Sequence, residues 1–179
     1  MTDARTHRRV IRNRKKSIVP LSKLRTSDVV KTVMDHPRRL EELVSMLEDK
    51  DRGIRGRAAA TLARLSESYP ARILRILPRL KEGLSDDAAY VRWHLVYTLG
   101  RLGARFPAPS RSFLHDLGAR LDDENRIVRI LACKALGQMA SRKPLMVEEF
   151  FKNGKREVPP AIARILRNSR VKSRSARNR

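Results

Sequence analysis

The sequence predicts an all-α fold in which three helical hairpins stack side by side. Two observations predict it: apolar and charged residues recur at a spacing of 37 residues, and the apolar residues of each repeat follow helical periodicity. The 179-residue chain is 41% hydrophobic, which is enough for a core even though 34% of its residues are charged. Because only 4% of the residues are aromatic, this core must be mostly aliphatic.

Each repeat begins with leucines spaced i, i+3 and i+7, which occupy one face of a helix. A polar turn follows, and then a second apolar stripe spaced i, i+4, i+8 and i+11. In the middle repeat this second stripe consists of Val91, Leu95, Leu99 and Leu102. One hairpin cannot bury such a stripe alone, so the three hairpins are expected to share a continuous core. Prolines mark the joins between repeats, at Pro70, Pro107 and Pro144.

An aspartate and an arginine also recur once per repeat, as Asp49, Asp86, Asp123 and Arg55, Arg92, Arg129. Residues with the period of a repeat array usually connect neighbouring repeats. We therefore interpret the set as an ion-pair ladder between repeats and not as a catalytic group, since structural ion-pair networks can imitate sites.

The pattern Asp-x4-[Val/Ile]-Arg in each repeat resembles that of the HEAT repeats, which are helical-hairpin units. Pro78 also matches the proline that often kinks the first helix of such a unit, and the resemblance covers about residues 38–144. It implies a right-handed α-solenoid whose second helices line a concave face. The family mostly provides curved surfaces for proteins or nucleic acids, so the resemblance implies a binding surface and no particular activity.

The ends of the array are expected to be caps. Ser27 is a candidate N-cap for a short leading helix. A degenerate fourth unit keeps Phe151, Val158 and Ile165 at the 37-residue offset, and Pro159-Pro160 interrupts it before one last short helix. The chain then divides into a basic N-terminal arm (1–27), a capping helix (28–36), three repeats (37–144), a C-terminal cap (145–167) and a basic tail (168–179).

Most of the formal net charge of +22 lies near the two ends of the chain. Residues 1–27 contain nine Lys or Arg and one acid, and residues 152–179 contain ten and one. The two arms have too few apolar groups to fold alone, so we expect them to be disordered when free. They predict a polyanionic partner, either nucleic acid or a nucleoprotein, although solubility or anionic lipid would also explain them. The arm residues expected to contact phosphate are Arg12, Arg14, Lys15, Lys16, Arg170, Lys172 and Arg174.

A helical wheel of the second helices places Trp93 and Tyr97 opposite the apolar stripe. In a HEAT-like arrangement that side forms a groove. We expect the groove to be positive, because the central parts of the second helices contain no Asp or Glu. The groove residues expected to bind a partner are Arg57, Arg64, Trp93, His94, Tyr97, Arg101 and Lys134.

Three interpretations of the two aromatic residues remain open. Beside arginines they suit base stacking with phosphate contact. They equally suit a protein hot spot, in which Trp, Tyr and Arg are enriched. Alternatively, Trp93 and Tyr97 pack on Gly56 and Ala60 of the preceding repeat as filler between helices.

The sequence predicts no catalytic, metal or cofactor site. HEAT-like DNA glycosylases use a carboxylate among aromatics and arginines, and this chain resembles them only in Trp93, Tyr97 and Arg101. The four histidines lack metal-ligand spacing, and no nucleotide-binding loop is present. The single cysteine, Cys133, excludes an intramolecular disulfide and is expected to be a small buried apolar residue.

No apolar run approaches the roughly 18 residues that span a bilayer, and no signal-peptide core follows the N-terminal charges. We therefore expect a cytoplasmic protein associated with a nucleoid or ribonucleoprotein, or a nuclear or mitochondrial one in a eukaryote. The predicted function is non-catalytic binding of nucleic acid or a nucleoprotein. The alternative is a protein scaffold that grips an acidic helix or peptide in the groove.

Overall fold

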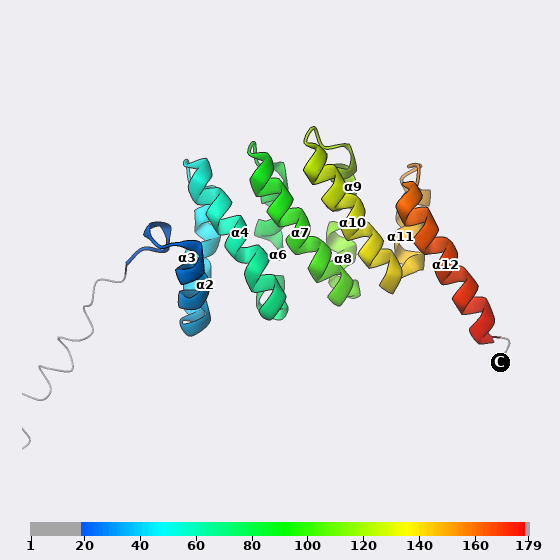
Figure 1. Cartoon of the computed structure of the whole chain (residues 1–179), viewed down its shortest axis with the longest axis horizontal. Coiled ribbons are helices and arrows are strands. Elements are labelled where there is room, and N and C mark those ends of the chain that lie inside the picture. The colour runs from blue at the N-terminus through cyan, green and yellow to red at the C-terminus, as the bar shows by residue number, and fades with distance from the viewer. Residues whose placement is uncertain (1–18, 178–179) are drawn as a thin grey trace, which may run out of the picture.

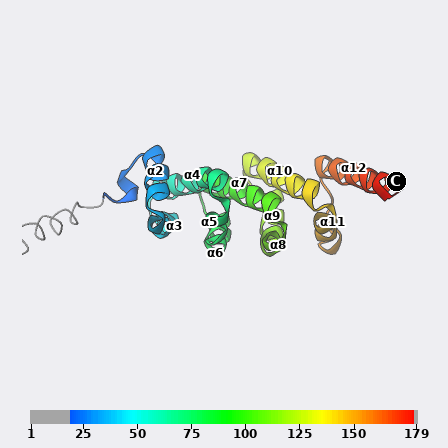
Figure 2. The same ribbon diagram turned by 90° about the horizontal axis from the view of Figure 1, so that it is seen from below.

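The computed structural model describes the backbone of residues 19–177 and the side chains of residues 19–169. Every regular element in that range is a helix, which confirms the all-α prediction. The helices lie in two layers along one direction, as Figures 1 and 2 show. The long-helix layer consists of α4 (Arg52–Ser68), α7 (Ala89–Arg105), α10 (Arg126–Arg142) and α12 (Pro160–Arg177).

The second layer, the short-helix layer, lies along one side of the long helices (Figure 2). It contains α3 (Leu40–Ser45), α5 (Pro70–Leu74), α6 (Leu77–Glu82), α8 (Pro107–Ser110), α9 (Leu114–Ala119) and α11 (Pro144–Asn153). Short 3-10 turns extend or precede these helices, at η3 (Pro37–Arg39), η4 (Met46–Glu48), η5 (Gly83–Ser85), η6 (Arg111–Phe113) and η7 (Arg120–Asp122). At the N-terminal end, η2 (Leu21–Lys23) leads into α2 (Thr26–Asp35), which packs on α4.

Local sequence explains where the long helices begin and end. The Asp51 side chain caps α4 by accepting from the Gly53 N–H at 2.7 Å, and Asn125 caps α10 by accepting from the Ile127 N–H at 2.9 Å. Each of α4, α7 and α10 ends two residues before a proline. The residue between adopts a non-helical conformation, as at Phe106 with φ −123° and ψ 78°, because a following proline disfavours the helical region.

The short helices are broken where the resemblance to HEAT repeats suggests a kink. Before α7 the break lies at Ile76, two residues before Pro78. Before α10 it lies at Phe113, with φ −126°, although His115 occupies the position equivalent to Pro78. A proline is therefore not required for this break.

The apolar stripes form one continuous core between the two layers. Leu43, Leu80 and Leu117 from the short helices are fully buried, as are Leu62, Leu99 and Leu136 from the long ones. The long helices α7 and α10 approach each other closely at Gly100, where a Cβ atom would lie only 2.5 Å from the Cβ of Ala135. Glycine is required at this crossing because no side chain fits there.

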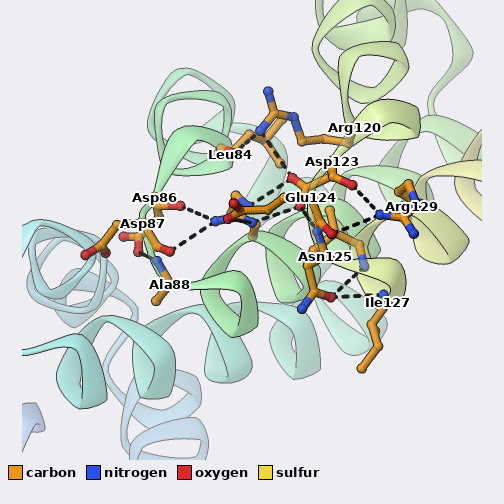
Figure 3. Close-up of polar contacts among 12 residues, drawn as sticks. Leu84, Asp86, Asp87, Ala88, Arg120, Asp123, Glu124, Asn125, Ile127 and Arg129 are labelled. Carbon is orange, nitrogen blue, oxygen red and sulfur yellow. Dashed lines mark hydrogen bonds and ion pairs between the residues drawn. The ribbon is translucent and has the colours of Figure 1, made fainter.

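The aspartates and arginines form ion pairs between long helices, and Figure 3 shows the contacts around Asp86 and Asp123. Arg55 donates from Nε to Asp86 at 2.6 Å, and Arg92 donates from Nε to Asp123 at 2.9 Å. Each arginine thus holds the aspartate that stands 31 residues further along the chain. Its Nη1 also donates to two backbone carbonyls of its own hairpin, for Arg92 those of Asp86 and Asp87 at 2.8 and 3.2 Å. Two of the recurring arginines thus pair with the two later aspartates, as the interpretation as a ladder expects.

Both ends of the chain correct the sequence prediction. The leading helix begins at Thr26, so Ser27 lies inside it and the extended residue Arg25 precedes it without a side-chain cap. The last helix is not short: α12 continues through residues 168–177, where the sequence predicts a disordered tail. No proline or glycine follows Pro160. Arg, Ala and Ser are the commonest residues of this helix, and its residues after Pro160 have at least moderate helix propensity.

The fourth unit also has a different register from the one predicted. The helices α7 and α10 begin three residues after Asp86 and Asp123, and α12 begins three residues after Glu157. Glu157 therefore stands where the ladder aspartate stands in the other repeats, at an offset of 34 residues from Asp123. In agreement, Ile162 is fully buried, like its counterpart two residues into each of the preceding long helices, Val91 or Val128.

Candidate functional site

A hollow on the exposed side of the long-helix layer brings together four of the predicted groove residues. This aromatic hollow has a volume of about 460 Å³ and is lined by Thr26, Ala60, Ala63, Arg64, Glu67, Trp93, His94, Tyr97 and Leu131. Its residues come from α2, α4, α7 and α10. The face opposite the apolar stripe is therefore indented, and Arg64, Trp93, His94 and Tyr97 share that indentation.

Trp93 is half-buried and lies at the edge of the core, with one side toward the hollow. Its ring packs edge-on against Tyr90 at 6.5 Å and against His94 at 5.8 Å between ring centroids. Tyr90, not Trp93, fills the space above Gly56, because a Cβ on Gly56 would overlap the Tyr90 ring. Tyr90 thus supplies the filler at Gly56, and Trp93 remains at the hollow.

Tyr97 is held in place by a carboxylate that the sequence analysis missed. Its hydroxyl donates to Glu67 Oε1 at 2.8 Å, and the Arg101 guanidinium lies 5.8 Å from its ring centroid. The hydrogen bond to Glu67, together with burial, raises the pKa of Tyr97. The central parts of the second helices contain no carboxylate, but the groove does contain one, because α4 continues to Ser68 and carries Glu67 into the hollow.

The charge of the aromatic hollow comes from its arginine and its glutamate. Burial, together with the nearby Arg64 guanidinium, lowers the pKa of His94 below its ordinary value. His94 is consequently neutral near pH 7. It offers a neutral hydrogen-bonding ring next to Trp93 and adds no positive charge.

A second hollow continues the first along the same face and is more basic. This arginine hollow has a volume of about 460 Å³ and is lined by Ser66, Glu67, Pro70, Arg101, Ala104, Arg105, Gln138, Ser141 and Arg142. Glu67 lines both hollows, so they adjoin. Arg105 and Arg142 lie in the last turns of α7 and α10, where the carbonyl ends of the helices favour cations.

Sequence reasoning missed Arg105 and Arg142, although a signal for them exists. Each stands two residues before the proline that ends its repeat, so they are related by the same 37-residue spacing as the ladder. The helical wheel covers only the central turns of each helix, and these positions fall outside it. Both side chains are exposed.

The remaining predicted residues lie elsewhere. Arg57 is half-buried and donates from Nη1 to the Leu24 carbonyl at 3.4 Å, so it lines neither hollow. Lys134 is exposed on α10 and also lines neither hollow. Arg12, Arg14, Lys15 and Lys16 lie outside the described residues. Arg170, Lys172 and Arg174 belong to α12, but their side chains lie outside the described ones.

Three further findings concern the chemistry open to this chain. Over residues 19–177, no helix is long and apolar enough to cross a membrane. In the same part of the chain, no group of three or more His, Cys, Asp or Glu side chains is placed to hold a metal ion. Cys133 is half-buried, and burial raises the pKa of its thiol.

No protein-family model matches the chain, and no curated protein matches it either.

Proposed function

We propose that this chain is a HEAT-like, right-handed α-solenoid with three repeats over residues 37–144. The lengths of the long helices support this assignment: α4, α7 and α10 each contain 17 residues and begin at Arg52, Ala89 and Arg126, at the predicted spacing of 37. The ladder supports it as well, because each rung joins equivalent residues of successive hairpins.

We infer that the long-helix layer binds nucleic acid without catalysis. One observation carries this inference: Arg64, Arg101, Arg105 and Arg142 are exposed and line adjoining hollows that contain a single carboxylate, Glu67. The hydroxyl of Tyr97 already occupies one oxygen of that carboxylate. A row of guanidinium groups along one face suits the regularly spaced phosphates of a nucleic acid backbone.

The aromatic hollow would add a contact to an unpaired base. Trp93 and Tyr97 lie beside Arg64 and Arg101, and this combination of aromatic faces with cations is typical of single-strand binding surfaces. Stacking on an aromatic ring is worth about 1–3 kcal/mol per base and depends little on sequence. We therefore propose a preference for single-stranded or locally unpaired nucleic acid over a fully paired duplex.

The basic ends of the chain would supply further phosphate contacts. The helix α12 projects beyond the rest of the molecule at its C-terminal end (Figure 1). Its sequence contains six Lys or Arg and no acid, so this end of the chain is a basic helix and not the disordered arm first expected. Each cation that neutralises a phosphate releases counterions, so the affinity would fall steeply with salt.

The experiment compares two pairs of charge-neutralising substitutions. Fluorescence anisotropy with a labelled single-stranded oligonucleotide gives the affinity and its dependence on salt. We expect Arg105→Gln with Arg142→Gln to weaken binding and to reduce the log–log salt slope by about 0.7 for each phosphate that the variant no longer neutralises. The matched pair, Arg75→Gln with Lys152→Gln, removes two exposed cations from the short-helix side of the molecule and should change affinity far less. If the two pairs lower the affinity equally, the proposal that nucleic acid binds the long-helix layer is contradicted.

A further inference from the structure

The ladder between long helices ends with an arginine that lacks its acidic partner. Arg55 contacts the carboxylates of Asp86 and Asp87. In the same way, Arg92 contacts the carboxylates of Asp123 and Glu124. Arg129 is their equivalent on α10. Its Nη1 donates to the Asp123 and Glu124 carbonyls at 2.6 and 2.9 Å, as the other two do in their own hairpins (Figure 3). Among the side chains that the structure describes, no carboxylate contacts Arg129.

The local sequence explains why this rung stays open. In the earlier turns the ladder aspartate accepts the backbone N–H two residues further on, as Asp86 does from Ala88 at 2.8 Å and Asp123 from Asn125 at 2.9 Å. Glu157 holds the equivalent place before α12, but the residue two positions later is Pro159, which has no N–H. Glu157 therefore cannot form the turn that holds the other acids against their arginines, and its side chain is exposed.

A hollow lies where the missing acid would sit. It has a volume of about 560 Å³ and is lined by Leu121, Asp122, Arg129, Ile130, Cys133, Arg156, Glu157, Pro159 and Pro160. One wall is apolar, and Ile130 is 54% exposed there, one of the most exposed large apolar side chains of residues 19–169. Arg156 is bound to the Asp122 carboxylate and to the Gly118 carbonyl, so it is already satisfied.

We propose that this hollow, the open-rung site, binds a peptide segment of a partner protein that carries an acidic residue next to an apolar one. The acid takes the place of the missing ladder carboxylate on Nε and Nη2 of Arg129, in the bidentate geometry that Asp123 adopts on Arg92. The apolar residue packs on Ile130 and the two prolines. The site is separate from the arginine and aromatic hollows, so it gives the protein a second partner.

The charge around the open-rung site favours a peptide over nucleic acid. Arg129 and Arg156 are matched there by Asp122 and Glu157, so the site has no surplus of positive charge. A phosphate backbone would meet two carboxylates, whereas the arginine hollow offers three arginines and one carboxylate. A peptide that carries one carboxylate and a neighbouring apolar side chain matches both the open guanidinium of Arg129 and the apolar wall beside it. The two closed rungs already show how a carboxylate binds such a guanidinium.

The test uses the acidic segment that Arg55 holds in this chain. A fluorescein-labelled peptide of residues 84–91, Leu-Ser-Asp-Asp-Ala-Ala-Tyr-Val, is titrated with the full-length protein and followed by anisotropy. We expect saturable binding that Arg129→Gln weakens about tenfold or more, the loss expected for a charge-assisted bidentate contact. The same peptide with Asp86→Asn and Asp87→Asn should bind the wild-type protein no more tightly than the unchanged peptide binds the Arg129→Gln protein. Ile130→Ser, at an exposed position, should also weaken binding and should leave the melting temperature unchanged.

Two comparisons make the result decisive. Arg105→Gln removes an equal charge from the arginine hollow and should leave peptide affinity unchanged; an equal loss in both variants would show non-specific attraction and overturn the proposal. Glu157→Gln removes the nearest competing acid and should tighten peptide binding. If it instead lowers the melting temperature and leaves binding unchanged, Glu157 closes the rung itself and no partner is needed. The assignment would also be overturned if a single-stranded oligonucleotide displaced the peptide and bound the Arg129→Gln variant more weakly than the wild type.

Discussion

Arg92 and Asp123 form a bidentate ion pair that is almost completely enclosed between α7 and α10. Nε and Nη2 of Arg92 donate to the two carboxylate oxygens of Asp123 at 2.9 and 2.8 Å, and the side chains are 4% and 2% exposed. The hydrogen bonds that Arg92 donates to Asp123 raise the pKa of Arg92, although burial opposes this shift. Each residue therefore depends on the other, because an unpaired charge in this position would have lost its water without compensation.

Removal of one partner of this pair should be costly. We expect Asp123→Ala to lower the free energy of unfolding by about 3–5 kcal/mol, since Arg92 stays buried without its buried counter-charge and keeps only the exposed Glu124 carboxylate. The control is Glu124→Ala, which removes the second carboxylate on the same guanidinium from a side chain that is 81% exposed. That change should cost less than about 1 kcal/mol. Urea denaturation followed by circular dichroism gives both values, and similar costs would show that the pair is not buried in solution.

The same ion pair should make stability fall in acid. Burial alone would raise the pKa of Asp123, but the hydrogen bonds from Arg92 and from the Asn125 backbone, with the charge of Arg92, outweigh it and lower the pKa. A carboxyl with a lower pKa in the folded state contributes stability that is complete above its unfolded pKa of 3.8 and is lost as pH falls through the folded value. Unfolding measured below about pH 5 should therefore show a smaller pH slope for Asp123→Asn than for the wild type. Parallel slopes would contradict the lowered pKa.

Two helical glycines should respond in opposite ways to a methyl group. A Cβ on Gly100 would lie 2.5 Å from the Ala135 Cβ and 3.0 Å from its Cα, so Gly100→Ala should force α7 and α10 apart and cost about 1–3 kcal/mol. A Cβ on Gly137 would meet only the flexible Cδ1 of Ile165, at 3.1 Å. Gly137→Ala should therefore be neutral, or stabilise the helix by up to about 1 kcal/mol. Thermal melts of the two variants test the packing of α7 on α10; an unchanged melt for Gly100→Ala would show that the helices are further apart.

The sequence predicted the helical class and the ladder because both depend on repeated local patterns. Leucines at helical spacing bury one face wherever they occur, and the recurrence of Asp86 and Asp123 with Arg55 and Arg92 implied contacts between neighbours. The register of the fourth unit was not predictable in the same way, because a three-residue shift before Pro160 breaks the period. The start of α12 at Pro160 and the burial of Ile162 in the folded chain reveal that shift.

The candidate site was predicted in part for a related reason. A helical wheel gives the side of one helix to which Trp93 and Tyr97 belong, so four groove residues fell into one hollow. It does not give the angle at which helices cross or the length of their last turns. The contact of Glu67 with Tyr97, and the position of Arg105 and Arg142, depend on that crossing and on where the helices end.

Glu67 should weaken nucleic acid binding in the wild-type protein. It contributes the single carboxylate of both hollows, so Glu67→Gln should raise the affinity for a single-stranded oligonucleotide by about two- to fivefold. The glutamine carbonyl can still accept the Tyr97 hydroxyl, so stability should not change. Glu149→Gln, an exposed acid on α11, is the control and should leave affinity unaltered. Weaker binding after Glu67→Gln would mean that the carboxylate itself contacts the partner, as in a glycosylase-like site.

The central claim, that the long-helix layer contacts nucleic acid, can be tested with the chain's own fluorescence. Trp93 is the single tryptophan of the sequence and lines the aromatic hollow. Titration with a single-stranded oligonucleotide, at several salt concentrations, should quench its emission in a saturable way, with a midpoint that moves to higher concentration as salt rises. An anisotropy signal from the labelled oligonucleotide that saturates while Trp93 emission stays constant would contradict the claim, because the nucleic acid would then be held away from the aromatic hollow.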